Sequence, residues 1–375
     1  KMAKRKLKIS EKKFKIVKPL KSSGGKSVYG FSSQLDETAI GKAIESAGEK
    51  MPSFVLSKIE IHPSKFCNLK CSCCYGAKLA PEILEGENLS LESIDNTLED
   101  VKENFSQNPL IILSGSYSEP LMHPKLNKII GSLGKNKFRF GLYTNGLLMK
   151  EGLMESLLES AESLSSEKPC FVSFNIFGSL NVGRFVRELS PIIEKLSKKR
   201  DRLEDKLEID APIIVPKQLC NYDFLYEVIG RLESFGVDNV RLTLPWNQLG
   251  KIKTKKYESI SKKELKRVLE VFRDLERDFD SVRIRSPQET RKHKKCYAMS
   301  MGASIGPNGN VYPCPEVSNP FREQLSYGNI TKKKFSEIWQ SEEHLRLFER
   351  LDPKKEGCLC CPAYDDINYL CSQLK

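Results

Sequence analysis

Several features are scarce or missing in this sequence, and each absence excludes some classes of protein or of binding site. No run of about 18 apolar residues occurs, so no membrane-spanning helix is predicted. The lysine-rich start has no apolar segment behind it, so no secretory signal is expected, and a cytoplasmic protein is predicted. The chain has only four histidines. Any metal site must therefore be built mainly from sulfur.

Cysteine, in contrast, is abundant, with twelve residues in a chain of 375. A disulfide framework is typical of short secreted domains, which this chain does not resemble in length or in its N-terminal sequence. Clustered cysteines in a reducing compartment more often bind metal. Because thiolate-rich sites select zinc or iron–sulfur clusters, these two kinds of site are the alternatives.

Positive charge is concentrated at the start of the chain. Of the net charge of +12, a net +10 lies in residues 1–26, and a smaller basic stretch covers residues 283–295. Both segments are either solvated surface or docking sites for an acidic partner, and the sequence leaves this open. Phe14 is the only aromatic residue among residues 1–26, which makes nucleic-acid binding by this arm unlikely.

Strand and helix patterns alternate from residue 55 onward. Strands are predicted at 55–61, 110–115, 139–146, 170–177, 207–215 and 239–245, and the clearest helices at 89–105 and 262–279. Repeated βα units predict a parallel sheet, and six units are too few for a closed eight-stranded barrel. We therefore expect an α/β fold with a partial (β/α)6 parallel barrel, whose ligands bind at the carboxyl ends of the strands.

The βα rhythm stops near residue 286, where Gly, Pro, Asn and Cys become frequent. We expect a basic N-terminal arm at 1–50, the partial barrel at 51–286, and a small cysteine-rich domain at 287–375. One helix is predicted in this last domain, at 333–351. The arrangement places the cysteine loop that follows the first strand at the ligand-binding end of the barrel.

That loop has the spacing Cys67-x3-Cys71-x2-Cys74. Three thiolates in a short loop can hold three irons of a 4Fe–4S cluster and leave the fourth iron open, whereas structural zinc normally takes four protein ligands. Cys73 is adjacent to Cys74, and neighbouring side chains in an extended loop point to opposite sides. Cys73 is therefore not expected to be a ligand.

The Cys67-x3-Cys71-x2-Cys74 loop resembles the signature of the radical S-adenosylmethionine (radical SAM) enzymes. The resemblance implies that SAM chelates the open iron and is cleaved to a 5′-deoxyadenosyl radical, which removes a hydrogen atom from the substrate. Family members usually have an aromatic residue just before the third cysteine. Here Cys73 occupies that place and Tyr75 follows, so the adenine contacts expected from this loop are in question.

Two further stretches resemble the SAM-binding segments of this family. LSGSYSEPLMHP (113–124) is similar to the Gly-Gly-Glu-Pro loop that binds the SAM ammonium, which implies Glu119 as its partner and Gly115, Ser116 and Ser118 as residues that shape the loop. LYTNGLL (142–148) is similar to the Thr-Asn-Gly end of the third strand and implies Asn145. An ordinary strand-to-helix turn is the alternative for the first stretch.

On the fourth predicted strand, Ser173 and Asn175 are candidates to contact the SAM ribose or carboxylate. Polar residues at the edge of the core are the alternative interpretation of both. Together with the loops above, these positions predict a SAM site at the carboxyl edge of the sheet.

The second cysteine group consists of Cys296, Cys314 and the pair Cys358-x2-Cys361. With the segments IGPNGNVYPCPE, YGNI (327–330) and FSEIW (335–339), it resembles the SPASM/Twitch extension of radical SAM proteins, which carries auxiliary 4Fe–4S clusters. The resemblance implies these four cysteines as ligands of one auxiliary cluster, as in the shorter Twitch form. A structural four-cysteine zinc site is the alternative.

Besides Cys73, four further cysteines lie outside the two predicted ligand sets. Cys360 is adjacent to Cys361, and neighbouring side chains point to opposite sides, so Cys360 is not expected to be a ligand. The sequence assigns no role to Cys371. Cys170 and Cys220 are expected to be small buried hydrophobic residues.

A fully ligated auxiliary cluster has no open iron, so its expected task is electron transfer, which favours net oxidation. Peptide substrates are common among relatives with this extension, and the arm could add a strand beside a leader peptide. We therefore expect oxidative modification of a ribosomally made peptide, with flavodoxin or ferredoxin as electron donor and no catalytic residue assigned. Dehydrogenation or epimerisation of a sugar or aminocyclitol is the second candidate, and a zinc-stabilised nucleic-acid-binding protein is the third.

Overall fold

The computed structural model describes residues 54–71, 88–115, 118–165, 168–177, 182–203, 205–245, 260–284, 295–314 and 324–353. Cys73, Cys74, Ser116, Cys358, Cys360, Cys361, Cys371 and the arm at 1–50 lie outside these ranges. Within them, no helix is long and apolar enough to span a membrane.

One large sheet dominates the described part of the chain. Its strands are β1 (Lys58–Ile61), β2 (Leu110–Leu113), β3 (Phe140–Thr144), β4 (Cys170–Phe174), β5 (Ile176–Phe177), β6 (Leu207–Ile214), β7 (Asn239–Thr243), β8 (Val282–Ile284), β9 (Gly302–Ile305), β10 (Asn310–Tyr312) and β11 (Gly328–Asn329). The order is β11-β10-β9-β1-β2-β3-β4-β6-β7-β8, and β5 pairs with β6. All neighbours from β9 to β8 are parallel, whereas β10 and β11 are antiparallel.

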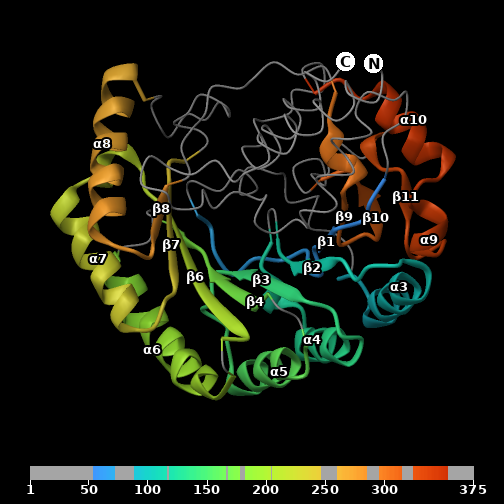
Figure 1. Cartoon of the computed structure of the whole chain (residues 1–375), viewed down its shortest axis with the longest axis horizontal. Helices are drawn as coiled ribbons and strands as arrows, with labels where there is room; N and C mark the ends of the chain where they lie inside the picture. The colour runs from blue at the N-terminus through green and yellow to red at the C-terminus, as the bar shows by residue number, and fades with distance from the viewer. Residues whose placement is uncertain are drawn as a thin grey trace, which may run out of the picture.

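Helices follow the strands and lie along one face of the sheet. They are α3 (Leu91–Asn104), α4 (Leu126–Lys135), α5 (Glu151–Glu162), α6 (Val182–Arg200), α7 (Tyr222–Ser234) and α8 (Lys262–Asp278). In Figure 1 these six helices form an arc around the curved sheet, from α3 on the right to α8 on the left. The predicted partial parallel barrel is confirmed by this arrangement.

The two faces of the sheet differ in chemistry, because successive side chains of a strand point to opposite faces. On the outer face, residues such as Ile59, Ile111 and Val172 belong to the main hydrophobic core. Among the described residues, the inner face has a small apolar cluster of Leu110, Ile112 and Phe171, and its other positions are largely polar. The inner face therefore offers groups that can bind a polar ligand.

Most predicted elements are present, with shorter ends. Ser90 caps α3 as expected, and its hydroxyl accepts a hydrogen bond from the Ser93 N–H. The predicted helix at 262–279 is α8, which begins with a capping box at Ser261. The predicted helix at 333–351 is wrong as one helix, because it is broken at residues 339–341. It forms α9 (Phe335–Ile338) and α10 (Glu342–Arg350), and Gln340 between them has a φ of 66°.

The sequence also missed strands at the end of the barrel. Only three residues form β8, which is too short for an alternating pattern to be recognised. β9 comes from the predicted C-terminal domain, yet it pairs in parallel with β1, with Lys58 opposite Gly302. The two predicted domains therefore share one continuous sheet, while the proposed boundary near residue 286 stays a prediction.

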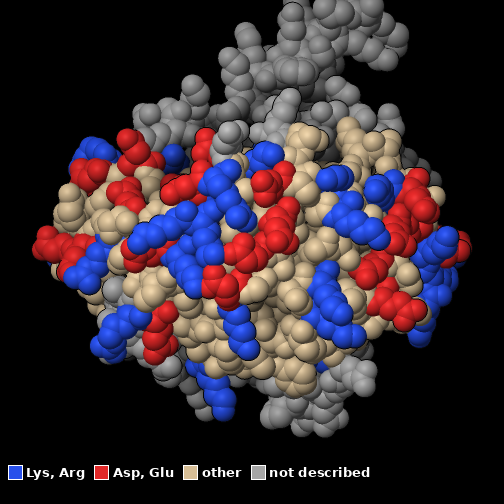
Figure 2. Space-filling view, turned by 90° about the horizontal axis from the view of Figure 1, so that it is seen from below, with Lys and Arg blue, Asp and Glu red and all other residues tan. Residues whose placement is uncertain are grey.

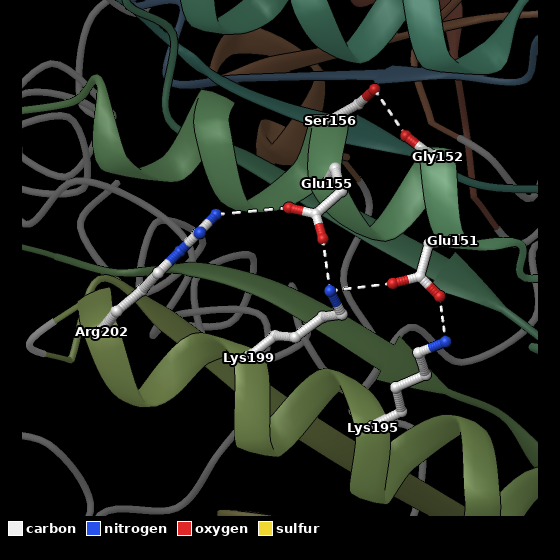
Figure 3. A network of polar contacts seen from close by, with 7 residues as sticks. All are labelled: Glu151, Gly152, Glu155, Ser156, Lys195, Lys199 and Arg202. Atoms are coloured by element: carbon white, nitrogen blue, oxygen red, sulfur yellow. Dashed lines mark hydrogen bonds and ion pairs between the residues drawn. The ribbon is translucent and has the colours of Figure 1, made fainter.

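Charges on the helical side of the molecule are mixed. Figure 2 shows this side, where Lys and Arg are interspersed with Asp and Glu. Figure 3 shows part of the reason: Glu151 of α5 pairs with Lys195 and Lys199 of α6, and Glu155 pairs with Lys199 and Arg202. These groups are substantially exposed, so water screens each pair and its contribution to stability is small. The visible surface presents no continuous field of one sign that would attract nucleic acid.

Candidate functional site

Three loops meet at the carboxyl edge of the sheet, after β1, β2 and β3. The loop after β1 carries Cys67, which is exposed, and Cys71, which is half-buried. The Glu119 N–H donates to the Phe66 carbonyl at 2.7 Å, and the Asn145 amide donates to the Asn68 side-chain oxygen at 2.8 Å. The cysteine loop is therefore fastened to both segments that were predicted to bind SAM.

The sulfur of Cys67 has a backbone donor of its own. The Leu69 N–H donates to Cys67 Sγ at 3.4 Å. A donor to sulfur favours the thiolate, the form that binds iron. Two of the three predicted ligands are thus presented by an ordered turn at the expected edge of the sheet, and Cys74 lies outside the described residues.

Glu119 is the central carboxylate of this edge. It accepts hydrogen bonds from the Thr144 hydroxyl at 2.5 Å, the Asn145 N–H at 2.8 Å and the Leu121 N–H at 3.1 Å. Burial raises its pKa, which these hydrogen bonds counteract, and no cationic residue is among the causes of the shift. Oε2 accepts one of these bonds and keeps capacity for another donor. A buried carboxylate with no cationic neighbour in the described part of the chain fits the ammonium of a ligand.

Gly115 and Ser118, two described residues that precede Glu119 in the predicted SAM-binding loop, lie close together. A Cβ at Gly115 would lie 2.1 Å from the Ser118 carbonyl oxygen, so only glycine fits there. Ser118 is buried, and Ser116 lies outside the described residues. The chain thus approaches itself closely between Gly115 and Ser118, directly before Glu119.

The remaining candidates for SAM contacts differ in their roles. Asn145 uses its side chain internally, since its oxygen accepts from the Leu147 N–H at 3.1 Å and its amide holds Asn68. Ser173 is buried on the inner face of β4. Asn175 is half-buried, and its N–H donates to the Thr144 carbonyl at 2.7 Å. All three residues lie near the same edge of the sheet, so they remain candidates for SAM contacts. The side chain of Asn145 mainly holds the cysteine loop in place through Asn68.

A buried polar cluster on the inner face of β1 was not recognised in the sequence. Lys58 Nζ lies 3.0 Å from Glu60 Oε2, and the Ser114 hydroxyl donates to Glu60 Oε1 at 2.6 Å. His62 Nε2 lies 3.0 Å from the hydroxyl of Ser304 on β9. Burial acts to raise the pKa of Glu60, but Lys58, His62 and Ser114 outweigh burial and lower it. The alternation in KIEIH was the available signal, since it places three polar groups on one face.

We expect Lys58→Met to destabilise the protein strongly. It would leave Glu60 buried without its cation, and breaking a buried pair typically costs about 3–5 kcal/mol. The Lys58→Met/Glu60→Gln double variant removes both charges and should recover a large part of the loss. Urea unfolding of the two variants measures the difference. A loss below about 1 kcal/mol for Lys58→Met would contradict the role given to this ion pair.

Two carboxyl groups on the inner face of β6 have raised pKa values. Burial and the nearby Asp210 and Asp238 raise the pKa of Glu208 to about 7. Burial raises the pKa of Asp210 to about 6, opposed by the Asn239 amide, which donates to it at 2.9 Å. Both groups thus hold protons in the folded state at a pH where the unfolded chain has released them.

The unfolding free energy should therefore decrease between about pH 4 and pH 7 through these two groups. Their protonated forms stabilise the fold fully below the unfolded pKa values of 4.5 and 3.8, and this contribution is lost as pH rises through about 6 and about 7. We expect Asp210→Asn and Glu208→Gln to flatten this dependence. Urea midpoints measured across this pH range test it, and an unchanged slope in both variants would refute it.

Cys296 and Cys314, the two described members of the second cysteine group, lie at the other end of β1 and β9. Cys296 directly precedes the short helix η8 (Tyr297–Ser300), which leads into β9, and Cys314 follows β10. Tyr312 pairs with Ser304 in antiparallel register, so Cys314 lies toward the amino end of β9, as does Cys296. The four residues of β1 span about 13 Å, and the Cys67 loop begins beyond their far end. Cys296 and Cys314 therefore lie well apart from Cys67 and Cys71.

Cys170 and Cys220 lie apart from both groups. Burial raises the pKa of Cys170 to about 12 and that of Cys220 to about 11, so both thiols stay protonated. Cys170 is buried in the core and Cys220 packs against it. Their predicted role as small hydrophobic residues agrees with this placement.

Two family models match this chain. Residues 61–178 match the radical SAM superfamily, and residues 296–362 match SPASM, described as an iron–sulfur cluster-binding domain. The chain is a radical SAM enzyme with a C-terminal SPASM domain. Its cofactors are SAM and a 4Fe–4S cluster, with auxiliary iron–sulfur binding in the SPASM domain. The zinc-protein alternative gains no support.

Similar proteins cover most of this radical SAM enzyme. A tungsten-containing aldehyde ferredoxin oxidoreductase cofactor-modifying protein of Pyrococcus furiosus is 26% identical over 304 residues, which cover 74% of this chain and 79% of that protein. Streptococcus suis SuiB bound to precursor peptide SuiA has a TM-score of 0.59 at 15% identity and covers 88% of this chain and 74% of its own. The enzyme anSMEcpe with bound AdoMet and Cp18Cys peptide has a TM-score of 0.55 at 18% identity, with coverage of 84% and 94%. These two structures share its fold.

Proposed function

We propose that this radical SAM enzyme oxidatively modifies a ribosomally made peptide, using a SAM-binding cluster held by Cys67, Cys71 and Cys74. The observation that carries the cluster assignment is the convergence of three loops, in which Phe66 and Asn68 are hydrogen-bonded to Glu119 and Asn145. When bound, the cluster and SAM supply one-electron chemistry and a carbon radical. The protein supplies position and exclusion of water.

The residues around the cluster loop have distinct parts in this proposal. Glu119 binds the SAM ammonium through Oε2, while Thr144 and Leu121 hold the carboxylate in place. Gly115 allows the close turn that aims Glu119 at the site. Ser173 and Asn175 contact the ribose or carboxylate from β4. Because Glu119 is already fixed by three donors, little ordering is needed when the ligand binds.

The auxiliary cluster is assigned to Cys296, Cys314, Cys358 and Cys361. Cys296 and Cys314, two of these four residues, lie toward the same end of β9. Four protein thiolates leave no iron open for substrate, which fits electron transfer during a net oxidation.

A peptide substrate is supported by the structural relatives. SuiB was solved with a precursor peptide, and anSMEcpe was solved with a peptide. A small molecule remains the second candidate, because the name of the Pyrococcus furiosus relative states that it modifies a cofactor. The sugar or aminocyclitol substrate considered from the sequence belongs to this second class.

An anaerobic activity assay tests the proposal. It contains the reconstituted enzyme, SAM and a reductant such as flavodoxin or ferredoxin. The probes are short peptides encoded beside the gene, and the expected result is 5′-deoxyadenosine together with a peptide that has lost hydrogen by mass. Deleting residues 2–21 should prevent processing of the peptide and leave SAM cleavage intact. If every peptide stays unmodified while a sugar or cofactor-like molecule is converted, the peptide proposal is wrong.

A further inference from the structure

The inner face of β7 carries an arginine, Arg241, in the middle of the strand. Its neighbours Val240 and Leu242 belong to the main hydrophobic core, and successive side chains of a strand point to opposite faces, so Arg241 points to the inner face. In Figure 1 this face is the concave side of the curved sheet, away from the helices. Because β7 belongs to the same parallel set as β1, β2 and β3, its inner face leads to the carboxyl edge that holds the predicted SAM site.

The guanidinium of Arg241 has no close counter-ion in the described part of the chain. Its Nε is buried and donates to no acceptor there, and no ion pair among the described residues includes it. Asp210 is the acidic group whose pKa the charge of Arg241 lowers. The Asp210 carboxyl accepts from the Asn239 amide at 2.9 Å, and burial outweighs both neighbours and raises its pKa to about 6. The positive charge of Arg241 is therefore poorly compensated by the protein.

A second arginine lies directly beside Arg241. Arg283 of β8 is its register partner in the parallel pairing of β7 and β8, so both side chains leave the sheet on the inner face. The Arg283 guanidinium donates to the carbonyls of Asp280 and Val282, the latter at 2.7 Å. Like charges directly opposite each other on neighbouring strands destabilise a sheet. The inner face thus concentrates positive charge at a cost in stability, which an anionic ligand would offset.

We propose that Arg241 binds a carboxylate of the peptide substrate and so selects the peptides that this enzyme modifies. A guanidinium forms two parallel hydrogen bonds with a carboxylate, and Arg241 is only half-buried, so part of it stays accessible. The radical SAM model matches residues 61–178, so β7 lies outside the segment with the predicted cluster and SAM contacts. The C-terminus of the peptide or an acidic side chain can supply the same carboxylate chemistry. This inference rests on the proposed peptide substrate.

The test compares the iron-loaded, full-length wild type with its Arg241→Gln variant on a peptide encoded beside the gene that the wild type processes. The peptide is used unchanged, with its C-terminus amidated, and with its Asp and Glu residues replaced by Asn and Gln. For the unchanged peptide we expect Arg241→Gln to raise KM at least about 30-fold with little change in kcat, because one partner of a shielded charge pair is lost. One altered peptide should show the same loss with the wild type and no further loss with Arg241→Gln, which identifies the carboxylate. Arg139→Gln is the matched control, because Arg139 is another half-buried arginine but its Nε donates to the Pro169 carbonyl at 2.7 Å, and it should leave KM unchanged.

Stability and SAM binding separate this role from the alternatives. Without peptide, the urea midpoint of Arg241→Gln should equal or exceed that of the wild type, and a clearly lower midpoint would show that the arginine serves the fold and overturn the proposal. Weaker SAM binding by this variant would assign the arginine to the SAM carboxylate, and normal processing of both altered peptides would exclude a carboxylate ligand. Either result refutes the inference. A wild type that processes no peptide would remove the peptide substrate and the inference with it, and that failure is distinct because it is seen before any variant is compared.

Discussion

Replacing Cys67, Cys71 and Cys74 together with alanine is expected to remove about four irons per chain and to abolish SAM cleavage. The reason is that no other cysteine of the described residues lies on this loop: Cys170 and Cys220 are protonated and packed on the core, and Cys296 and Cys314 lie at the opposite end of β1. Iron assays and 5′-deoxyadenosine formation by anaerobically purified protein measure the two effects.

Two control variants make this experiment specific. Cys73→Ala changes the adjacent thiol, which is predicted to face away from the cluster, and should keep the iron content. Cys220→Ala removes a thiol from another part of the fold. If the triple variant still forms 5′-deoxyadenosine at the wild-type rate, the ligand assignment is wrong. If Cys73→Ala loses as much iron as Cys74→Ala, the choice between the two neighbours must be reversed.

Changing Glu119 to glutamine should weaken SAM binding by about 100-fold, or about 3 kcal/mol, the low end for removing one partner of a buried ion pair. Glutamine keeps the size of the side chain but replaces one oxygen with a donor. It loses the charge that would face the SAM ammonium. Graded addition of SAM to the reduced enzyme, followed by the change in the cluster signal, gives the affinity.

Thr144→Val is the matched control for this variant. It removes one of the three donors to Glu119 but keeps the carboxylate, so SAM affinity should fall by less than tenfold, the loss of roughly one neutral hydrogen bond. Iron content and urea midpoint should be reported for both variants, because Glu119 also fastens the loop of Phe66. Affinity within about threefold of the wild type for folded, iron-loaded Glu119→Gln would show that the ammonium binds elsewhere.

Local patterns were sufficient for much of the fold. The alternation of apolar runs and amphipathic segments gave β1 to β7 except the two-residue β5, and Ser90 and Ser261 begin α3 and α8. These features depend on neighbouring residues along the chain. The helix predicted at 333–351 failed because its pattern continues through residues 339–341, where Gln340 takes a left-handed conformation that periodicity does not reveal.

The Cys67, Cys71 and Cys74 loop was enough to predict the chemistry of this enzyme, because it resembles the radical SAM signature and three thiolates within one loop need no other segment to meet. Tertiary structure alone decided which distant groups meet: β9 beside β1, Glu119 bound to Asn145, and Ser114 bound to Glu60 on the inner face. The physical reason is that strand pairing is set by backbone hydrogen bonds and the burial of whole faces. A sequence specifies which face is apolar, but it does not specify which strand becomes the neighbour.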